Sequence, residues 1–459
     1  MKRIKSVLVK AWDLIKSSKK WQAILSGILA VVIGGAGFAV GYSVGNKPQD
    51  VNAELSSEEI GSSEEGSSVE ESSEEIVVSS EEESSVEESS EEESSSENDS
   101  SVEDEEERKP SEGLEYTLSD DGTYYIVTGI GTCTDTVVVI PNTYEDLPVE
   151  HIGRRAFEWC SSLTEVVVPD GVTSIDFAVF FGCSSLTKVV IPNGVTSIGE
   201  SAFGSCSSLM EVEIPDSVTS IGDMAFFRCS GLTEVVIPDN VTSIGEFAFE
   251  NCSSLTEVVI GDKVSSIGDG VFFICSSLTN ITVKENNTWY SSLDGNLYNK
   301  DQTMLIQYAS GKTDKTFTIS DCITSIVEGA FWFSYDLMEI LVDENNSNYS
   351  SLDGNLYNKD QTTLIQYGIG KTDSLFIIPD GVKSIFEAAF ADCAYLTEII
   401  IPNSVTNIDN WAFQCCDSLT SVKFEGTVEQ WEAIYKDDYW NDQVPATEVV
   451  CNNGVVPLT

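Results

Sequence analysis

The fold is decided by residues 232–254, LTEVVIPDNVTSIGEFAFENCSS, because the same pattern recurs along the chain at a fixed interval. Phenylalanines, isoleucines and leucines keep a step of 23 residues, and so do six cysteines: Cys160, Cys183, Cys206, Cys229, Cys252 and Cys275. The phase continues after two intervals of 59 residues, at Ile326 and Ile385, and returns to 23 at Ile408, which gives nine repeats. A period of about 20–29 residues with apolar positions in register predicts a solenoid, whose turns bury their apolar faces against one another.

Within one turn, the pattern Leu-x-x-Val-x-Val predicts a β-strand, because β-branched residues suit a pleated strand. In the turn that starts at Leu163, Pro169 ends this strand, as proline does at a strand boundary. Val172 and Ile175 are expected to point inward from the returning segment, and Phe180 is expected to fill the core. The sequence therefore predicts a β-rich solenoid of 23-residue repeats with two longer inserts.

Residues 232–254 closely resemble the BspA-like class of leucine-rich repeats, and the resemblance covers about residues 114–459. Other segments also look typical of such proteins: an entry segment at 116–131, two near copies at 289–308 and 348–367, and the end from Gly426 to Gly454. The resemblance implies a right-handed leucine-rich repeat solenoid. It also implies a surface protein that binds other proteins or cells without catalysis, and it does not identify the ligand.

The repeats also set the expected domain boundaries. We expect an N-terminal capping module at 113–150 and a C-terminal capping module at 425–459. Between them lies the repeat array at 151–424, with inserts near 284–320 and 343–379.

The N-terminal region predicts a membrane anchor. Residues 23–44 are 22 residues without a formal charge, long enough to span a hydrocarbon core of about 30 Å as a helix. Residues 1–22 are basic, so the positive-inside rule places them in the cytoplasm and the rest of the chain outside the cell. A cleaved signal peptide is the alternative, but the long basic region and long apolar run favour a single-pass anchor.

Three glycines in and just after this segment, Gly37, Gly41 and Gly45, form a doubled GxxxG pattern. Small residues at this spacing permit close helix–helix contact, which predicts a weak homodimer. The alternative is that glycine is simply common in membrane helices.

Residues 45–112 predict a disordered acidic stalk. From residue 50 this segment is mostly serine and glutamate, with 26 acidic and two basic residues and no aromatic one. Such a composition buries too little apolar surface to offset the entropy of ordering, and its like charges extend the chain.

The charge and composition exclude several classes of function. A net charge of −52 argues against nucleic acid as a partner, because binding phosphates needs a basic face. The single histidine, His151, leaves little room for acid–base chemistry or a multi-histidine metal site. Two Gly-Lys-Thr triplets, at 311–313 and 370–372, lack the first glycine of a phosphate-binding loop and are expected to be turns. The sequence therefore predicts no catalytic site, no cofactor and no metal.

The cysteine column admits two interpretations. Stacked turns in an extracellular protein could bring neighbouring thiols within disulfide range. Against this, free cysteine is among the most buried residue types, and one cysteine per turn is typical of a packing column.

Two columns of the predicted strand are expected to face outward on the concave sheet. The acidic column contains Glu165, Glu211, Glu234, Glu257, Glu339 and Glu398. The aliphatic column contains Val167, Val190, Val236, Val259, Leu341 and Ile400. An exposed apolar stripe beside like charges predicts a site for a partner. The alternative is that these residues only serve strand propensity and stacking between turns.

The sequence as a whole predicts a non-catalytic, membrane-anchored protein of the cell surface that mediates adhesion or protein recognition. The alternative function is that of a passive structural protein of the cell envelope, without a specific ligand. The two differ in whether the region after the stalk binds a defined protein or cell in a saturable manner.

Overall fold

The computed structural model describes residues 109–458. The chain divides into two units, and all described residues belong to the second, Glu105–Thr459. The predicted cytoplasmic segment 1–22, the anchor 23–44 with its glycines, and the predicted stalk up to residue 108 lie outside the described residues. Within the part of the chain that is described, no helix is long and apolar enough to cross a bilayer.

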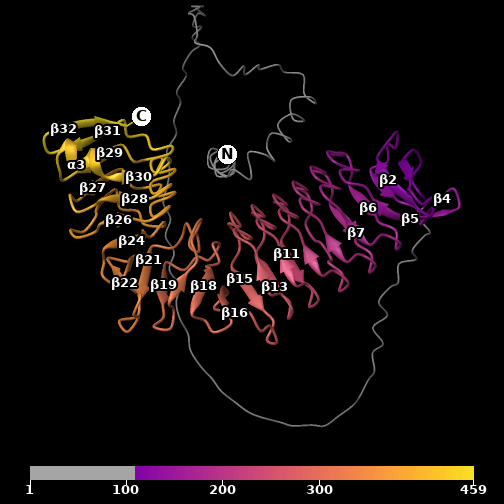
Figure 1. The fold of residues 1–459 in the computed structure, drawn as a ribbon, viewed down its shortest axis with the longest axis horizontal. Helices are drawn as coiled ribbons and strands as arrows, with labels where there is room; N and C mark the ends of the chain where they lie inside the picture. The colour runs from indigo at the N-terminus through magenta and orange to yellow at the C-terminus, as the bar shows by residue number, and fades with distance from the viewer. Residues whose placement is uncertain (1–108, 459) are drawn as a thin grey trace, which may run out of the picture. The chain divides into compact units, whose positions relative to one another are not determined.

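The described residues form a β-solenoid in which most turns contribute one long and one short strand (Figure 1). We call the surface formed by the long strands the strand face. The long strands are β3 (Val137–Val139), β6 (Glu165–Val167), β8 (Lys188–Val190), β11 (Glu234–Ile237), β13 (Glu257–Ile260), β15 (Asn280–Val283), β19 (Thr316–Ile319), β21 (Glu339–Val342), β25 (Leu375–Ile377), β27 (Glu398–Ile401), β29 (Ser421–Phe424) and β31 (Glu448–Cys451).

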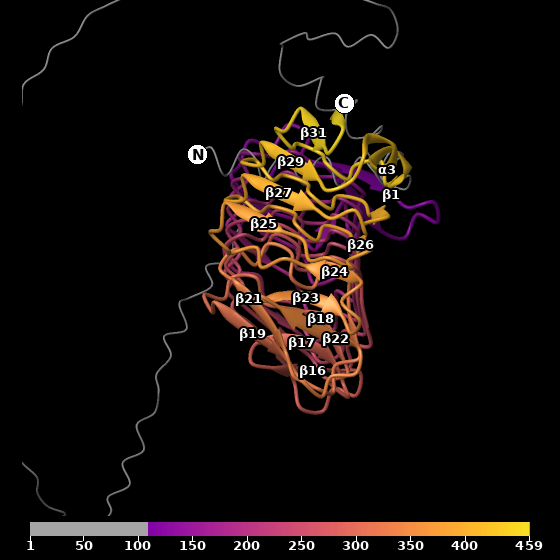
Figure 2. The ribbon, with the colours of Figure 1, turned by 90° about the vertical axis from the view of Figure 1, so that its left-hand side faces the viewer.

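The returning segment of each turn contributes the second strand. These strands are β5 (Leu147–Ile152), β7 (Ser174–Ile175), β9 (Ser197–Ile198), β10 (Ser220–Ile221), β12 (Ser243–Ile244), β14 (Ser266–Ile267), β18 (Met304–Gln307), β20 (Ser325–Ile326), β24 (Thr363–Gln366), β26 (Ser384–Ile385), β28 (Asn407–Ile408) and β30 (Tyr435–Lys436). In Figure 2, β25 and β27 lie on one side of the stack, and β24 and β26 lie on the other.

Neighbouring turns pair in parallel and in register with the repeat. In β11 and β13, Glu234 lies opposite Glu257 and Val236 opposite Val259. The same residue types therefore form continuous columns along the stack. This is the arrangement expected when each turn buries its apolar positions against the next one.

Phenylalanine rings form one of these columns in the core. The rings of Phe157, Phe180, Phe203, Phe226 and Phe249 follow one another with centroid separations of 5.2 to 5.4 Å and interplanar angles of 2 to 14°. The predicted inward positions Val172 and Ile175 are also fully buried. The predicted core positions of the repeat are thus confirmed.

Cysteines form a second column beside the rings. The thiol of Cys229 is buried, and its Sγ donates a hydrogen bond to the carbonyl oxygen of Phe203 in the preceding turn, at 3.1 Å. The same contact recurs at 3.0 to 3.3 Å for Cys183, Cys206, Cys252, Cys275 and Cys416. All the cysteines are free thiols, and Cys160 at the start of the column is only half-buried. The structure therefore shows a packing column in place of disulfides.

Each interval of 59 residues contains a hairpin and one further turn of the solenoid. The hairpins are formed by β16 (Tyr290–Leu293) with β17 (Asn296–Asn299), and by β22 (Tyr349–Leu352) with β23 (Asn355–Asn358). After them, β19 and β25 pair in parallel with β21 and β27 as ordinary long strands. The predicted inserts near 284–320 and 343–379 thus include strands of the main stack.

The repeat marks are absent in these further turns for a physical reason. Tyr308 occupies the position that the core phenylalanine has in other turns. The backbone hydrogen bonds show this: the N–H of Tyr308 donates to Ala330 O (2.9 Å), just as the N–H of Phe226 donates to Ala248 O (2.8 Å). Three residues later, Gly311 replaces the cysteine. A Cβ atom on Gly311 would lie 2.2 Å from the carbonyl carbon of Ser277, so no side chain fits there.

Other elements close the two ends of the stack. At the start, β1 (Glu115–Leu118), β2 (Tyr125–Gly129) and β4 (Thr143–Tyr144) precede the first full turns, and Tyr116 stacks on Tyr144 at 3.9 Å. At the end, α3 (Val428–Ala433) and β32 (Gly454–Pro457) cover the last turn. Thr427 and Gln430 form a capping box at the start of α3, and the side chain of Trp431 on this helix is buried.

Candidate partner-binding surface

The strand face presents alternate residues of each long strand to solvent. In β11, Glu234 and Val236 are exposed, whereas Val235 and Ile237 are buried. This alternation follows from the pleat, which turns successive side chains to opposite faces. The two columns expected from the sequence therefore lie side by side on one surface.

The acidic column is only partly paired with neighbouring turns. The amide nitrogen of Asn280 donates to Glu257 Oε1 at 2.9 Å, and the hydroxyl of Thr316 donates to Glu339 Oε2 at 3.3 Å. Lys423 forms an ion pair with Glu398. Glu211 is exposed like its neighbours in the column, but its segment forms no regular strand. Carboxylates that face solvent in register give the strand face a negative potential.

The aliphatic column is exposed at three of its six predicted positions. The exposed fractions are 45% for Val190, 53% for Val236 and 38% for Leu341. The other three, Val167, Val259 and Ile400, are half-buried. Each of the six belongs to a strand, and Val167 lies opposite Val190 as Val236 lies opposite Val259.

The structure adds residues to this column that the repeat pattern missed. Pairing of β25 with β27 places Ile377 opposite Ile400, and the side chain of Ile377 is 54% exposed. Val139 lies opposite Val167, and Val450 lies opposite Lys423, in the same register. The apolar, β-branched run Leu-Phe-Ile-Ile at 375–378, followed by Pro379 as in other turns, was the signal for the first of these.

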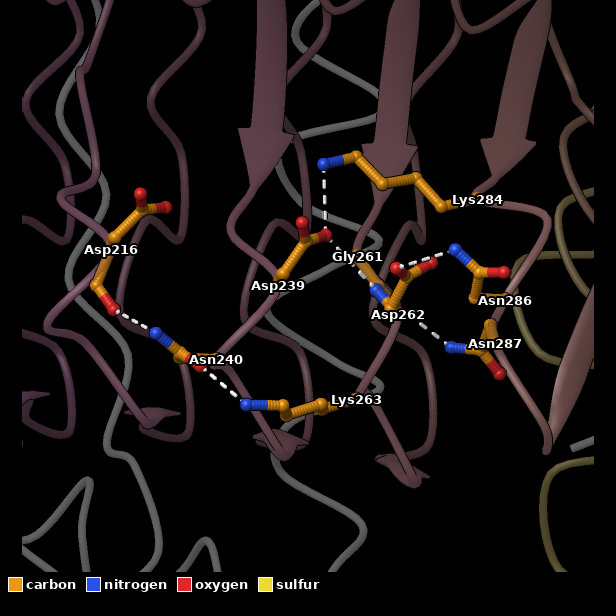
Figure 3. A network of polar contacts seen from close by, with 9 residues as sticks. All are labelled: Asp216, Asp239, Asn240, Gly261, Asp262, Lys263, Lys284, Asn286 and Asn287. Atoms are coloured by element: carbon orange, nitrogen blue, oxygen red, sulfur yellow. Dashed lines mark hydrogen bonds and ion pairs between the residues drawn. The ribbon is translucent and has the colours of Figure 1, made fainter.

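A polar network stabilises the loops that follow β11, β13 and β15 (Figure 3). Lys284 reaches back across two turns, and its Nζ lies 2.8 Å from Asp239 Oδ1. This hydrogen bond holds the pKa of Asp239 below its ordinary value. Lys263 Nζ donates to Asn240 Oδ1 at 2.7 Å, and Asn240 in turn donates to the carbonyl of Asp216. Hydrogen bonds and an ion pair thus connect neighbouring turns along the edge of the strand face.

The single histidine and the lysines of the two Gly-Lys-Thr triplets pack against aromatic rings. His151 packs against the ring of Tyr124, with centroids 5.1 Å apart. Lys312 and Lys371 of the Gly-Lys-Thr triplets lie over the rings of Tyr308 and Tyr367 and follow turns. In residues 109–458, no group of three or more His, Cys, Asp or Glu side chains is placed to hold a metal ion.

The fold is that of a leucine-rich repeat solenoid, and similarity to known proteins identifies its family. The description "BspA type leucine rich repeat region" matches residues 150–279 and 371–435, in six copies. The chain is 33% identical to a leucine-rich repeat protein of T. pallidum, covering 38% of this chain and 80% of that one, with a TM-score of 0.36. The chain belongs to the BspA-type leucine-rich repeat family.

Two further solved structures are similar over most of their length. A leucine rich cell surface protein from Faecalibacterium prausnitzii is 29% identical, covering 72% of this chain and 98% of that one, with a TM-score of 0.50. The pneumococcal vaccine antigen PcpA is 21% identical, covering 75% of this chain and 98% of that one, with a TM-score of 0.53. The second likeness shows the fold alone. None of the curated proteins matches the chain.

The family is one of surface proteins, and its solenoid is typically a scaffold for binding. A general role in protein binding or adhesion at the cell surface is therefore consistent with the fold and the family.

Proposed function

We propose that this protein recognises a protein partner at the cell surface through the strand face, without catalysis. The observation that carries the proposal is the exposed aliphatic column of Val190, Val236 and Leu341 beside a column of glutamates. Apolar side chains that recur at one solvent-facing position lose contact with water only when another molecule covers them.

The test uses the compact unit Glu105–Thr459 and a triple variant. Val190→Thr, Val236→Thr and Val259→Thr keep the shape and strand propensity of each residue but remove apolar surface. The labelled unit should bind intact cells of a suitable panel in a saturable manner, as measured by flow cytometry. The triple variant should bind at least tenfold more weakly, with an unchanged melting temperature.

The matched control replaces exposed apolar residues outside this column, Tyr395→Thr and Tyr435→Thr. This control should bind as the unchanged protein does. Equal binding by the triple variant would refute the role of the column. Absence of any saturable binding would favour the passive structural role instead.

We also propose that residues 23–44 anchor the chain in the membrane, with 1–22 in the cytoplasm. The uncharged length of this segment and the basic residues before it support the proposal. Protease added to intact cells should remove the solenoid and leave a short membrane-bound fragment. Weak dimerisation through Gly37, Gly41 and Gly45 is tested by crosslinking, where Gly41→Ile should lower the yield of dimer.

A further inference from the structure

A cavity of about 590 Å³ opens on the strand face where its sheet is interrupted. On one side, β21 ends a two-stranded sheet with β19, and on the other side β25 begins the next sheet with β27. In the sequence, the hairpin of β22 and β23 lies between β21 and β25, and its Asp353 lines the cavity. The cavity is therefore a product of the second hairpin, and it lies within the aliphatic and acidic columns.

Part of the cavity lining is aromatic and apolar. Tyr367 and Phe376 line it, with their rings inclined at 61° to each other and their centroids 4.9 Å apart. Ile377 and Met338 complete the apolar lining. Tyr367 is 99% buried, and its hydroxyl has no hydrogen-bond partner among residues 109–458.

Both lysines that line the cavity are already engaged. Lys371 donates to the carbonyl oxygen of Asp353, and its Nζ lies 5.0 Å from the centroid of the Tyr367 ring. Burial lowers the pKa of Lys371. Lys315 forms an ion pair with Asp336, which is not part of the lining. Neither ammonium group is available to neutralise an incoming anion.

The carboxylates of the lining, Glu339, Asp353 and Asp373, all attract the ammonium group of Lys371, but they outnumber the two lysines. Glu339 accepts a hydrogen bond of 3.3 Å from the hydroxyl of Thr316. Asp353 and Asp373 are exposed beside it. Three carboxylates against two lysines leave the lining with a net negative charge beside its apolar and aromatic part. This combination favours a ligand group that joins a positive charge to an apolar stem.

We propose that this cavity receives an arginine side chain from an extended, basic segment of the partner protein. The proposal rests on the proposed function and names the chemistry of the partner. A guanidinium group stacks on an aromatic ring, here the half-buried ring of Phe376, and binds carboxylates through two parallel hydrogen bonds, which an ammonium group cannot do. The residues that flank the arginine then lie along Leu341 and Ile400, and their charge complements the acidic column.

The probe is the peptide acetyl-Val-Arg-Val-amide, titrated into the unit Glu105–Thr459 at about 0.15 M salt, where weak surface attraction is largely screened. We expect binding with a Kd of the order of 1 mM, measured by chemical-shift changes. The same peptide with citrulline in place of arginine has the same shape without the charge, and it should bind at least tenfold more weakly.

Two double variants with equal charge change separate the cavity from the general negative field. The cavity variant is Glu339→Gln with Asp373→Asn. The control is Glu257→Gln with Asp314→Asn: Glu257 belongs to the same acidic column as Glu339, and Asp314 lies 59 residues before Asp373, at the equivalent position of the earlier turn. The cavity variant should lose about tenfold in affinity, and the control less than twofold, with equal melting temperatures for both.

Equal losses in the two variants, equal binding of the citrulline peptide, or absence of binding by the arginine peptide would each overturn the proposal. The proposed function fails separately. If the unit binds cells in a manner that depends on Val190, Val236 and Val259 but ignores the arginine peptide, the strand face recognises its partner without this cavity.

Discussion

Glu250 is a carboxyl group held inside the packed stack. Its side chain is only 4% exposed, and burial raises its pKa to about 8, although Arg228 in the preceding turn opposes this shift. The carboxyl therefore binds its proton more tightly in the folded than in the unfolded chain. The stability that the neutral form provides is fully present below about pH 4.5, and it is lost as the pH rises towards 8.

Glu250→Gln should remove this part of the pH dependence. The free energy of unfolding of the variant should exceed that of the unchanged protein increasingly between about pH 5 and pH 8, because the amide needs no proton to stay neutral. Urea unfolding at three pH values measures the difference. Glu425→Gln, at an exposed position, is the control, and its curve should run parallel to that of the unchanged protein. A constant difference for Glu250→Gln would contradict the inferred protonation.

The buried thiols should be unreactive in the native protein. Burial raises the pKa of Cys229 to about 12, so the reactive thiolate is scarce at pH 8. Of the twelve free cysteines, nine are buried, and only Cys133, Cys160 and Cys322 reach solvent. A thiol reagent should label at most three groups quickly in the native protein and twelve after unfolding. Fewer than twelve after unfolding would reveal disulfides.

At the scale of elements, each hairpin is tied to the stack by one buried asparagine. Asn287 is fully buried, and its Nδ2 donates to the carbonyls of Gly261 (2.8 Å) and Val264 (3.0 Å). Its Oδ1 accepts from the N–H groups of Trp289 and Tyr290. Asn346 makes the equivalent contacts before the second hairpin. One side chain thus satisfies four backbone groups where the chain leaves the regular turn.

Asn287→Ala should cost about 3 kcal/mol or more in the free energy of unfolding, since it leaves these backbone groups without partners. The adjacent Asn286→Ala is the matched control. Its amide makes one exposed contact with Asp262, and its loss should cost less than about 1 kcal/mol. Chemical unfolding of both variants gives the comparison. Similar costs would show that the buried asparagine is not the anchor.

The sequence specifies the regular turns well, because each position of the repeat has one environment. The inward positions, the strand positions and the two outward columns all follow from the period. The repeat pattern did not predict the turns inside the 59-residue intervals, because Tyr308 and Tyr367 replace the core phenylalanine there, and Gly311 and Gly370 replace the cysteine. The cavity was equally hidden, since it depends on where the second hairpin interrupts the sheet.

At the scale of the whole molecule, the stack should tolerate the loss of a complete turn. Deletion of residues 186–208 joins Ser185 to Leu209 and recreates the original Ser-Leu junction in register. The shortened unit should keep its β-sheet circular dichroism and unfold cooperatively, with a modest loss of stability from one missing interface. Deletion of residues 186–196 should abolish cooperative unfolding, because it shifts every later column out of phase.

The in-register columns also have a consequence for inheritance. Because one turn presents nearly the same ring, thiol and strand to its neighbour as the next turn does, unequal crossing-over between copies in the gene adds or removes whole turns without a structural defect. Descendants of such a gene would differ first in length. Selection can therefore vary how far the protein reaches, and how many outward positions it displays, before any single residue has to change.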